Sequence, residues 1–116
     1  MEAKVLVMKC SKTNELFGVR IQKMEDNDWH RTWAFRLNEQ QVQHERYNSF
    51  TVNGSLKKTK DFPGCPYCGR QGFAICGYCK KVFCWNGKQH TCRCPWCNNT
   101  SHIKVVNHFS VRTNEL

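Results

Sequence analysis

Between Cys65 and Cys97 the chain reads CPYCGRQGFAICGYCKKVFCWNGKQHTCRCPWC, and eight of its nine cysteines lie in this stretch. Three pairs of cysteines are separated by two residues: 65/68, 76/79 and 94/97. This spacing lets the backbone fold back so that both sulfurs face one ion, about 2.3 Å away. A redox-active pair explains one such motif, but not three in so short a stretch. The pattern predicts a metal-binding module, with zinc as the ion that best suits tetrahedral thiolate sites.

Eight thiols are enough for two Zn²⁺ ions. The predicted ligands are Cys65, Cys68, Cys76, Cys79, Cys84, Cys92, Cys94 and Cys97. The preferred grouping is sequential: the first four cysteines hold one ion, and the second ion takes the rest, with Cys92 or His90 as its fourth ligand. In a nested grouping, 65/68 pairs with 94/97 around an inner site. A crossed, RING-like grouping is the third possibility, and spacing does not choose among the three.

The ninth cysteine, Cys10, lies far from the others in sequence, and we expect it to be an ordinary half-buried thiol. The N-terminal stretch lacks the features of a secretory signal, and no apolar run is long enough to cross a bilayer. We therefore expect a cytoplasmic protein with reduced thiols, in which cysteine clusters bind metal rather than form disulfides.

The formal net charge of +9 is compatible with a nucleic-acid partner. Basic residues also interleave with aromatic ones in the module, a pattern seen in single-strand binding; they are Lys80, Lys81, Lys88 and Arg93 with Phe83, Trp85 and Trp96. A zinc ion with four thiolates carries −2, however, so two such sites bring +9 down to +5. Much of the basic excess then balances the metal sites.

Upstream of the module, alternating apolar residues predict strands at 3–9, 16–22 and 29–37, and we expect Trp33 and Phe35 in the core. Asn38 with Gln41 resembles a capping box and predicts a short helix over 39–47. Residues 50–56 suit a strand followed by a tight turn at Asn53-Gly54. The tail suits one more strand.

These elements predict a small, β-rich α+β fold: antiparallel strands and one short helix, continuous with a double zinc-ribbon-like module. We divide the chain into an N-terminal part (1–60), the cysteine module (61–97) and a tail (98–116). A closed thiolate shell indicates structural zinc. The second half has only two carboxylates, Asp61 and Glu115, and no catalytic constellation appears, so we expect no enzymatic activity.

The motifs also resemble a known family. Asp61-Phe-Pro-Gly-Cys-Pro-Tyr-Cys-Gly69, Val82-Phe-Cys-Trp-Asn-Gly87 and Cys94-Pro-Trp-Cys97 are similar to the TerY-C metal-binding domain. The stretches Lys9-Cys-Ser-Lys-Thr13, Phe17-Gly-Val-Arg20 and Thr32-Trp-Ala-Phe35 extend the resemblance upstream, so that it covers about residues 4–97.

That resemblance implies a zinc module of TerY-type tellurium-resistance proteins, where it is attached to a von Willebrand factor A domain. It also implies association with kinases and phosphatases in bacterial stress-response or defence systems. We expect the module to stand alone here, and therefore to act as an adaptor that binds such a partner in trans. The alternatives are a nucleic-acid-binding zinc ribbon and a RING-like ligase module.

Overall fold

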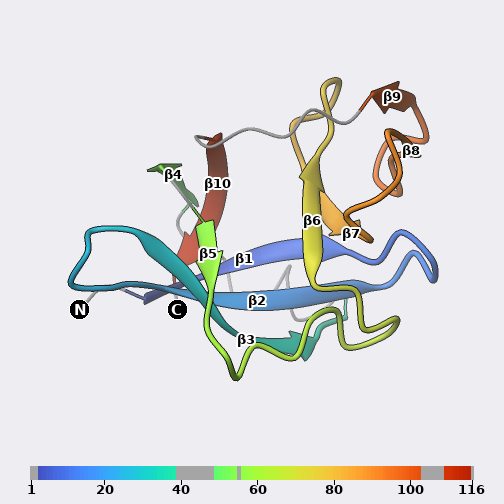
Figure 1. Cartoon of the computed structure of the whole chain (residues 1–116). Coiled ribbons are helices and arrows are strands. Elements are labelled where there is room, and N and C mark those ends of the chain that lie inside the picture. The colour runs from blue at the N-terminus through green and yellow to red at the C-terminus, as the bar shows by residue number, and fades with distance from the viewer. Residues whose placement is uncertain (1–2, 39–48, 55, 103–108, 116) are drawn as a thin grey trace.

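The computed structural model of the chain describes residues 3–38, 49–54, 56–102 and 109–115 (Figure 1). Ten strands and no helix are found in these ranges, so the α+β prediction is wrong for the described part of the chain. Each of these elements pairs its backbone with a neighbouring strand. The segment predicted as a helix, 39–47, lies outside the described residues.

The first three strands form an antiparallel meander at the centre of the larger sheet. They are β1 (Ala3–Lys9), β2 (Leu16–Lys23) and β3 (Trp29–Arg36), close to the predicted ranges. β1 and β2 pair from Ala3↔Gln22 to Lys9↔Leu16. Phe17, Val19 and Ile21 alternate along β2 and are at most 1% exposed, because they face the core.

The prediction that Trp33 belongs to the core is wrong, since this side chain is 53% exposed. Arg20 pairs with Trp33 but Ile21 pairs with Arg31, so β3 carries an extra residue at Thr32. One extra residue reverses which side chains face inward. The buried residues of β3 are therefore Trp29, Arg31 and Ala34.

The strands on either side come from distant parts of the sequence, giving the order β4-β10-β1-β2-β3-β5. β4 (Ser49–Gly54) pairs with β10 (Phe109–Glu115), which pairs with β1, whereas β5 (Leu56–Lys58) runs parallel to β3. Because β4 and β5 lie at opposite edges, the predicted tight turn at Asn53-Gly54 does not join a hairpin.

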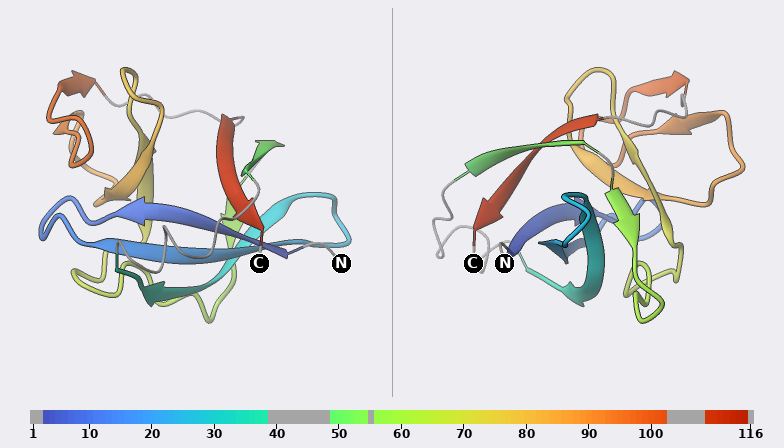
Figure 2. Two further views of the ribbon diagram at one scale, coloured as in Figure 1. Left: turned by 180° about the vertical axis from the view of Figure 1, so that it is seen from behind. Right: turned by 60° about the vertical axis from the view of Figure 1, so that its left-hand side comes forward.

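The cysteine-rich part contributes two further hairpins. β6 (Gly72–Ile75) pairs with β7 (Val82–Trp85), and β8 (Thr91–Arg93) pairs with β9 (Thr100–His102). β7 also runs parallel to the end of β1, through Met8↔Val82 and Lys9↔Phe83. Figure 2 shows the β8–β9 hairpin at the end of the molecule opposite the start of β1 and the end of β10.

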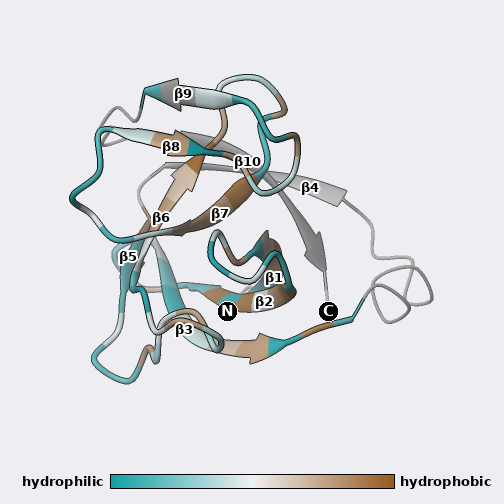
Figure 3. Ribbon diagram, turned by 90° about the vertical axis from the view of Figure 1, so that its right-hand side faces the viewer, coloured by the Kyte–Doolittle hydropathy of each residue, from teal (hydrophilic) through white to brown (hydrophobic). Residues whose placement is uncertain are grey.

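Two clusters of buried residues form the core. The larger joins the meander to the cysteine-rich part, since Leu6 and Phe17 belong to the same cluster as Phe62, Val82 and Cys84. The smaller surrounds Phe83 and lies between β6–β7 and the loop after β8. Apolar residues accordingly follow β1, β2, β6 and β7 in Figure 3. The division at 60/61 and 97/98 stays a prediction.

Candidate metal centres

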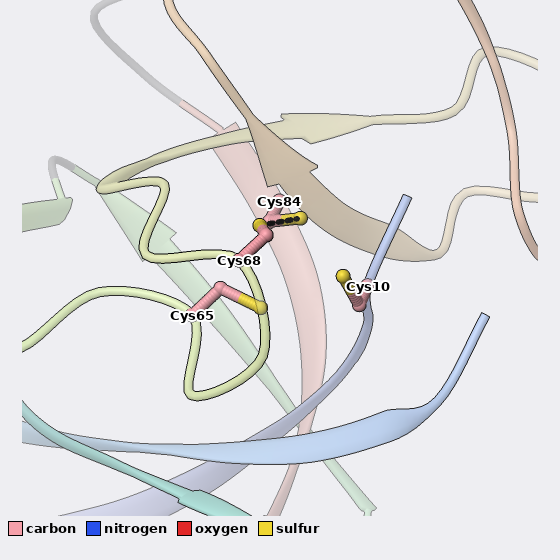
Figure 4. A group of neighbouring side chains, drawn as sticks. All are labelled: Cys10, Cys65, Cys68 and Cys84. Carbon is pink, nitrogen blue, oxygen red and sulfur yellow. Dashed lines mark hydrogen bonds between the residues drawn. The ribbon is translucent and has the colours of Figure 1, made fainter. Parts of the chain in front are cut away.

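Eight of the nine cysteines converge in two groups of four. Centre 1 consists of Cys10, Cys65, Cys68 and Cys84, and centre 2 consists of Cys76, Cys79, Cys94 and Cys97. Within each group all four sulfurs lie within 4.8 Å of one another. Figure 4 shows the centre 1 side chains approaching from three separate segments: the end of β1, the loop after Phe62, and β7.

The sulfur positions fit a tetrahedral metal site. Four thiolates about 2.3 Å from one ion have sulfurs about 3.8 Å apart. The Sγ–Sγ distance is 3.6 Å for Cys68–Cys84, 3.6 Å for Cys76–Cys97 and 3.7 Å for Cys79–Cys94. A disulfide needs about 2.05 Å, and all nine cysteines are free thiols. The donors therefore fit a metal ion at each centre.

A scan against family models matches residues 1–114 to the TerY-C metal binding domain. The chain belongs to this family. Comparison with the curated proteins and with the solved structures finds no match. The metal-binding character predicted from the cysteine spacing is thus confirmed at the level of the family and of the two four-thiol groups.

Three loops of this TerY-C domain present their cysteines in the same way. In each, the N–H of the first cysteine donates to the carbonyl five residues later, and the N–H four residues later donates back to that cysteine's carbonyl, at 2.8–3.0 Å. We call these six-residue segments knuckle loops; they are 65–70, 76–81 and 94–99. The fifth position has positive φ in all three, at Gly69, Lys80 and Asn98.

Residues 10–15 form one more knuckle loop, which explains how Cys10 reaches centre 1; numbered in chain order, the first to fourth knuckle loops are 10–15, 65–70, 76–81 and 94–99. Cys10 N–H donates to the Glu15 carbonyl at 2.8 Å, Asn14 N–H donates to the Cys10 carbonyl at 2.9 Å, and Asn14 has a φ of 61°. Thr13 stands at the position that holds the second cysteine in the other three loops. Cys84, on β7, completes the four thiols.

Backbone N–H groups point at the first sulfur of the knuckle loops. Tyr78 and Cys79 N–H lie 3.4 and 3.5 Å from Cys76 Sγ, and Trp96 N–H lies 3.3 Å from Cys94 Sγ. Such donors stabilise thiolates and fix the ligand geometry. In the first loop, burial opposes ionisation, but hydrogen bonds from Thr13 and the Lys12 N–H outweigh it and lower the pKa of Cys10 to about 7.

The remaining thiols differ according to burial. Burial raises the pKa of Cys94 to about 12 and also raises the pKa of Cys65. The pKa of Cys97, by contrast, is lowered to about 6, chiefly by the backbone N–H of Asn99. Both centres thus contain buried thiols that hold their protons at neutral pH, and a metal ion must displace these protons when it binds.

Cys84 has its own set of contacts. Ser11 N–H and Ser11 Oγ both lie 3.3 Å from Cys84 Sγ, and Arg70 Nη1 donates to Ser11 Oγ at 2.7 Å. These contacts connect the first two knuckle loops through their side chains. They hold Cys84 in place although it has no partner cysteine on its own strand.

The structure distributes the predicted ligands differently from the preferred sequential grouping. Along the chain the pairs alternate between the centres: 65/68 in centre 1, 76/79 in centre 2, 84 in centre 1 and 94/97 in centre 2. This alternation follows the crossed alternative, with Cys10 as an additional ligand. Cys92 lies outside both groups and faces Gln89 Oε1 at 3.7 Å, and His90 is exposed and also outside them.

The aromatic residues that interleave with basic ones are largely engaged within the fold. Phe83 is 1% exposed. Trp96 donates from Nε1 to the Val82 carbonyl at 2.7 Å, and Lys9 and Lys81 place their ammonium groups over its ring. These contacts fasten the fourth knuckle loop to β7. They leave few aromatic faces for stacking with bases.

The positive φ of Lys80 leads to a stability prediction. A left-handed conformation costs a residue with a Cβ about 1–2 kcal/mol, whereas glycine, which has no Cβ, adopts it without this steric cost. We expect Lys80→Gly to raise the free energy of unfolding by about 1 kcal/mol, measured by urea denaturation with saturating zinc. Lys88→Gly is the control, because Lys88 has no positive φ, and it should lower stability. If Lys80→Gly lowers the free energy of unfolding as much as the control does, the left-handed conformation assigned to Lys80 is contradicted.

Proposed function

We propose that the chain is a zinc-stabilised, non-catalytic protein-interaction module. The observation that carries this proposal is that each centre consists of four thiols. Four thiolates fill the tetrahedral shell of zinc and leave no position for a substrate or an activated water. Zinc is the ion of choice because it prefers such sites and does no redox chemistry.

Free thiols in both centres suit a reducing compartment, and we propose a cytoplasmic location. Within the described residues, none forms a helix of the length and apolar character that a membrane crossing requires. A role beside von Willebrand A, kinase or phosphatase proteins in a bacterial stress response, including tellurium resistance, belongs to the same proposal. It rests on the family alone.

The surface offers two aromatic residues as anchors for a partner. Tyr78 is 66% exposed at the tip of the third knuckle loop, and Trp33 is 53% exposed on β3. Aromatic side chains carry much of the binding energy at protein interfaces. Tyr78 is held on a loop whose position the metal fixes, so it is preorganised for contact.

Removal of the metal tests the stabilising role. Two of the four buried residues in the cluster around Phe83 are the ligand cysteines Cys76 and Cys94, so we expect zinc binding to supply folding energy there. We expect two zinc ions per chain by native mass spectrometry. When a strong chelator is added, we expect the β-sheet circular dichroism signal of the chain to decrease as the cysteine-rich part unfolds. A metal-free chain with the same spectrum and the same unfolding midpoint would overturn this proposal.

The interaction role has a separate test. Tyr78→Ala should weaken binding to a von Willebrand A domain protein from the same cell at least tenfold, while zinc content and stability stay unchanged. Tyr67→Phe is a matched control, because Tyr67 is a knuckle-loop tyrosine that turns inward and donates from its hydroxyl to the Leu16 carbonyl. Equal binding by wild type and Tyr78→Ala, measured by calorimetry, argues against this surface.

The alternating ligand order favours a RING-like ligase module as a second candidate. Such a module accelerates transfer of a ubiquitin-type protein from a conjugating-enzyme thioester. Faster discharge of that thioester in the presence of the zinc-loaded chain supports this candidate, and an unchanged rate eliminates it.

A further inference from the structure

A pocket of about 420 Å³ opens beside centre 1, between the first knuckle loop and the β8 strand. This volume lies in the range of small-ligand sites, about 300–1,000 Å³. Three basic side chains line it, namely Lys12, Arg70 and Arg93. Among the described residues of its wall there is no carboxylate.

The remaining wall supplies hydrogen-bond donors and one aromatic surface. Ser11 and Thr91 contribute hydroxyl groups, Gln89 an amide, and Trp85 its indole, and the thiols of Cys84 and Cys92 complete the wall. Arg70 is held by its hydrogen bond to Ser11 Oγ at 2.7 Å, so its guanidinium is already ordered. Trp85 is likewise fixed, because Nε1 donates to the Gln89 carbonyl at 2.9 Å.

The zinc thiolates of centre 1 do not account for all three cations. Only Arg70 is connected to a ligand sulfur, through Ser11 and Cys84. In the described part of the chain, neither Lys12 nor Arg93 forms an ion pair, and both are exposed to solvent at the pocket wall. Cations that converge on one pocket with hydroxyl donors suit a compact oxyanion rather than an extended chain of single charges.

We propose that this pocket binds a phosphate group, as a phosphomonoester or free phosphate. A phosphomonoester carries nearly two negative charges at pH 7 and three acceptor oxygens, matching the three cations and the Thr91 hydroxyl. The linear phosphodiester backbone of a nucleic acid carries one charge per phosphate and fits a pocket of this shape less well. The proposal goes beyond the interaction role above and does not depend on it.

The test is a ¹H–¹⁵N NMR titration of the zinc-loaded full chain with three probes: inorganic phosphate, a phosphoserine peptide and adenosine 5′-monophosphate. We expect saturable shifts at Ser11, Arg70 and Thr91. An ester that binds at least tenfold tighter than inorganic phosphate identifies its class as the source. Equal affinity for all three identifies free phosphate. Binding should weaken at pH 5, where the group loses one charge.

Two variants separate the pocket from general charge. Lys12→Ala and Arg93→Ala should each weaken binding at least fivefold and keep two zinc ions by native mass spectrometry. Lys88→Ala removes the same charge from a nearby loop residue that does not line the pocket, and it should leave affinity unchanged. The proposal is overturned if no probe gives saturable shifts, if Lys88→Ala weakens binding equally, or if an oligonucleotide without terminal phosphates binds as tightly.

Discussion

Replacing Cys10 by serine is expected to reduce the metal content from two ions per chain to one. Cys10 supplies one of the four thiols of centre 1, although 54 residues separate it from Cys65. Loss of a ligand thiolate also leaves the buried thiols Cys65 and Cys84 and the half-buried Cys68 without their ion. We expect the free energy of unfolding to fall by about 4 kcal/mol or more, since loss of a structural metal is among the largest effects of a single substitution.

The matched control is Cys92→Ser. Cys92 lies within the cysteine-rich stretch but outside both centres, so this variant should keep two metal ions and change stability by less than about 1 kcal/mol. Native mass spectrometry and urea denaturation measure both quantities. If Cys92→Ser binds one metal ion and Cys10→Ser binds two, then Cys92 and not Cys10 is the metal ligand.

Replacing Arg31 by methionine is the second change with a large expected effect. Arg31 is 8% exposed, donates to the Gln71 carbonyl at 2.6 Å and to the Lys57 carbonyl at 3.3 Å, and lies over the rings of Phe62 and Phe73. Burial lowers its pKa to about 10, so it is still charged at neutral pH. The side chain therefore connects β3 to the segments on both sides of the second knuckle loop.

Methionine fills a similar volume but cannot donate to the two carbonyl groups. Leaving them unsatisfied, and losing two cation–π contacts, should cost about 3 kcal/mol of unfolding free energy. Arg36→Met on the same strand is the control, because Arg36 is exposed and its guanidinium lies 5.2 Å from the centroid of the Tyr67 ring. It should cost less than about 1 kcal/mol. Equal effects of the two variants would contradict the connecting role of Arg31.

The strands of the meander could be predicted because their residues alternate. Phe17, Val19 and Ile21 face one side of β2, and this pattern is local. The burial on β3 could not be predicted, because an extra residue at Thr32 depends on pairing with β2. The Asn53-Gly54 turn failed for a related reason: β4 and β5 find partners at opposite edges of the sheet, and local turn chemistry does not specify long-range pairing.

Some metal ligands could likewise be predicted from the sequence, and others could not. The second cysteines of the knuckle loops, Cys68, Cys79 and Cys97, are evident from spacing. The role of Cys10 is not, because Thr13 replaces the second cysteine of its loop. Its one sequence signal is Asn14, placed four residues after the cysteine, where the other loops have Gly69, Lys80 and Asn98. Which thiols share an ion depends on β7 pairing with β1, and spacing carries no information about that.

Eight thiols form two alternating centres, and Cys10 belongs to the first. ¹H–¹¹³Cd correlation NMR of the chain, with cadmium as the bound metal, shows directly which cysteines share an ion. We expect two cadmium resonances, one coupled to the β-protons of Cys10, Cys65, Cys68 and Cys84, and the other to those of Cys76, Cys79, Cys94 and Cys97. Coupling of cadmium to Cys92, with none to Cys10, would contradict it.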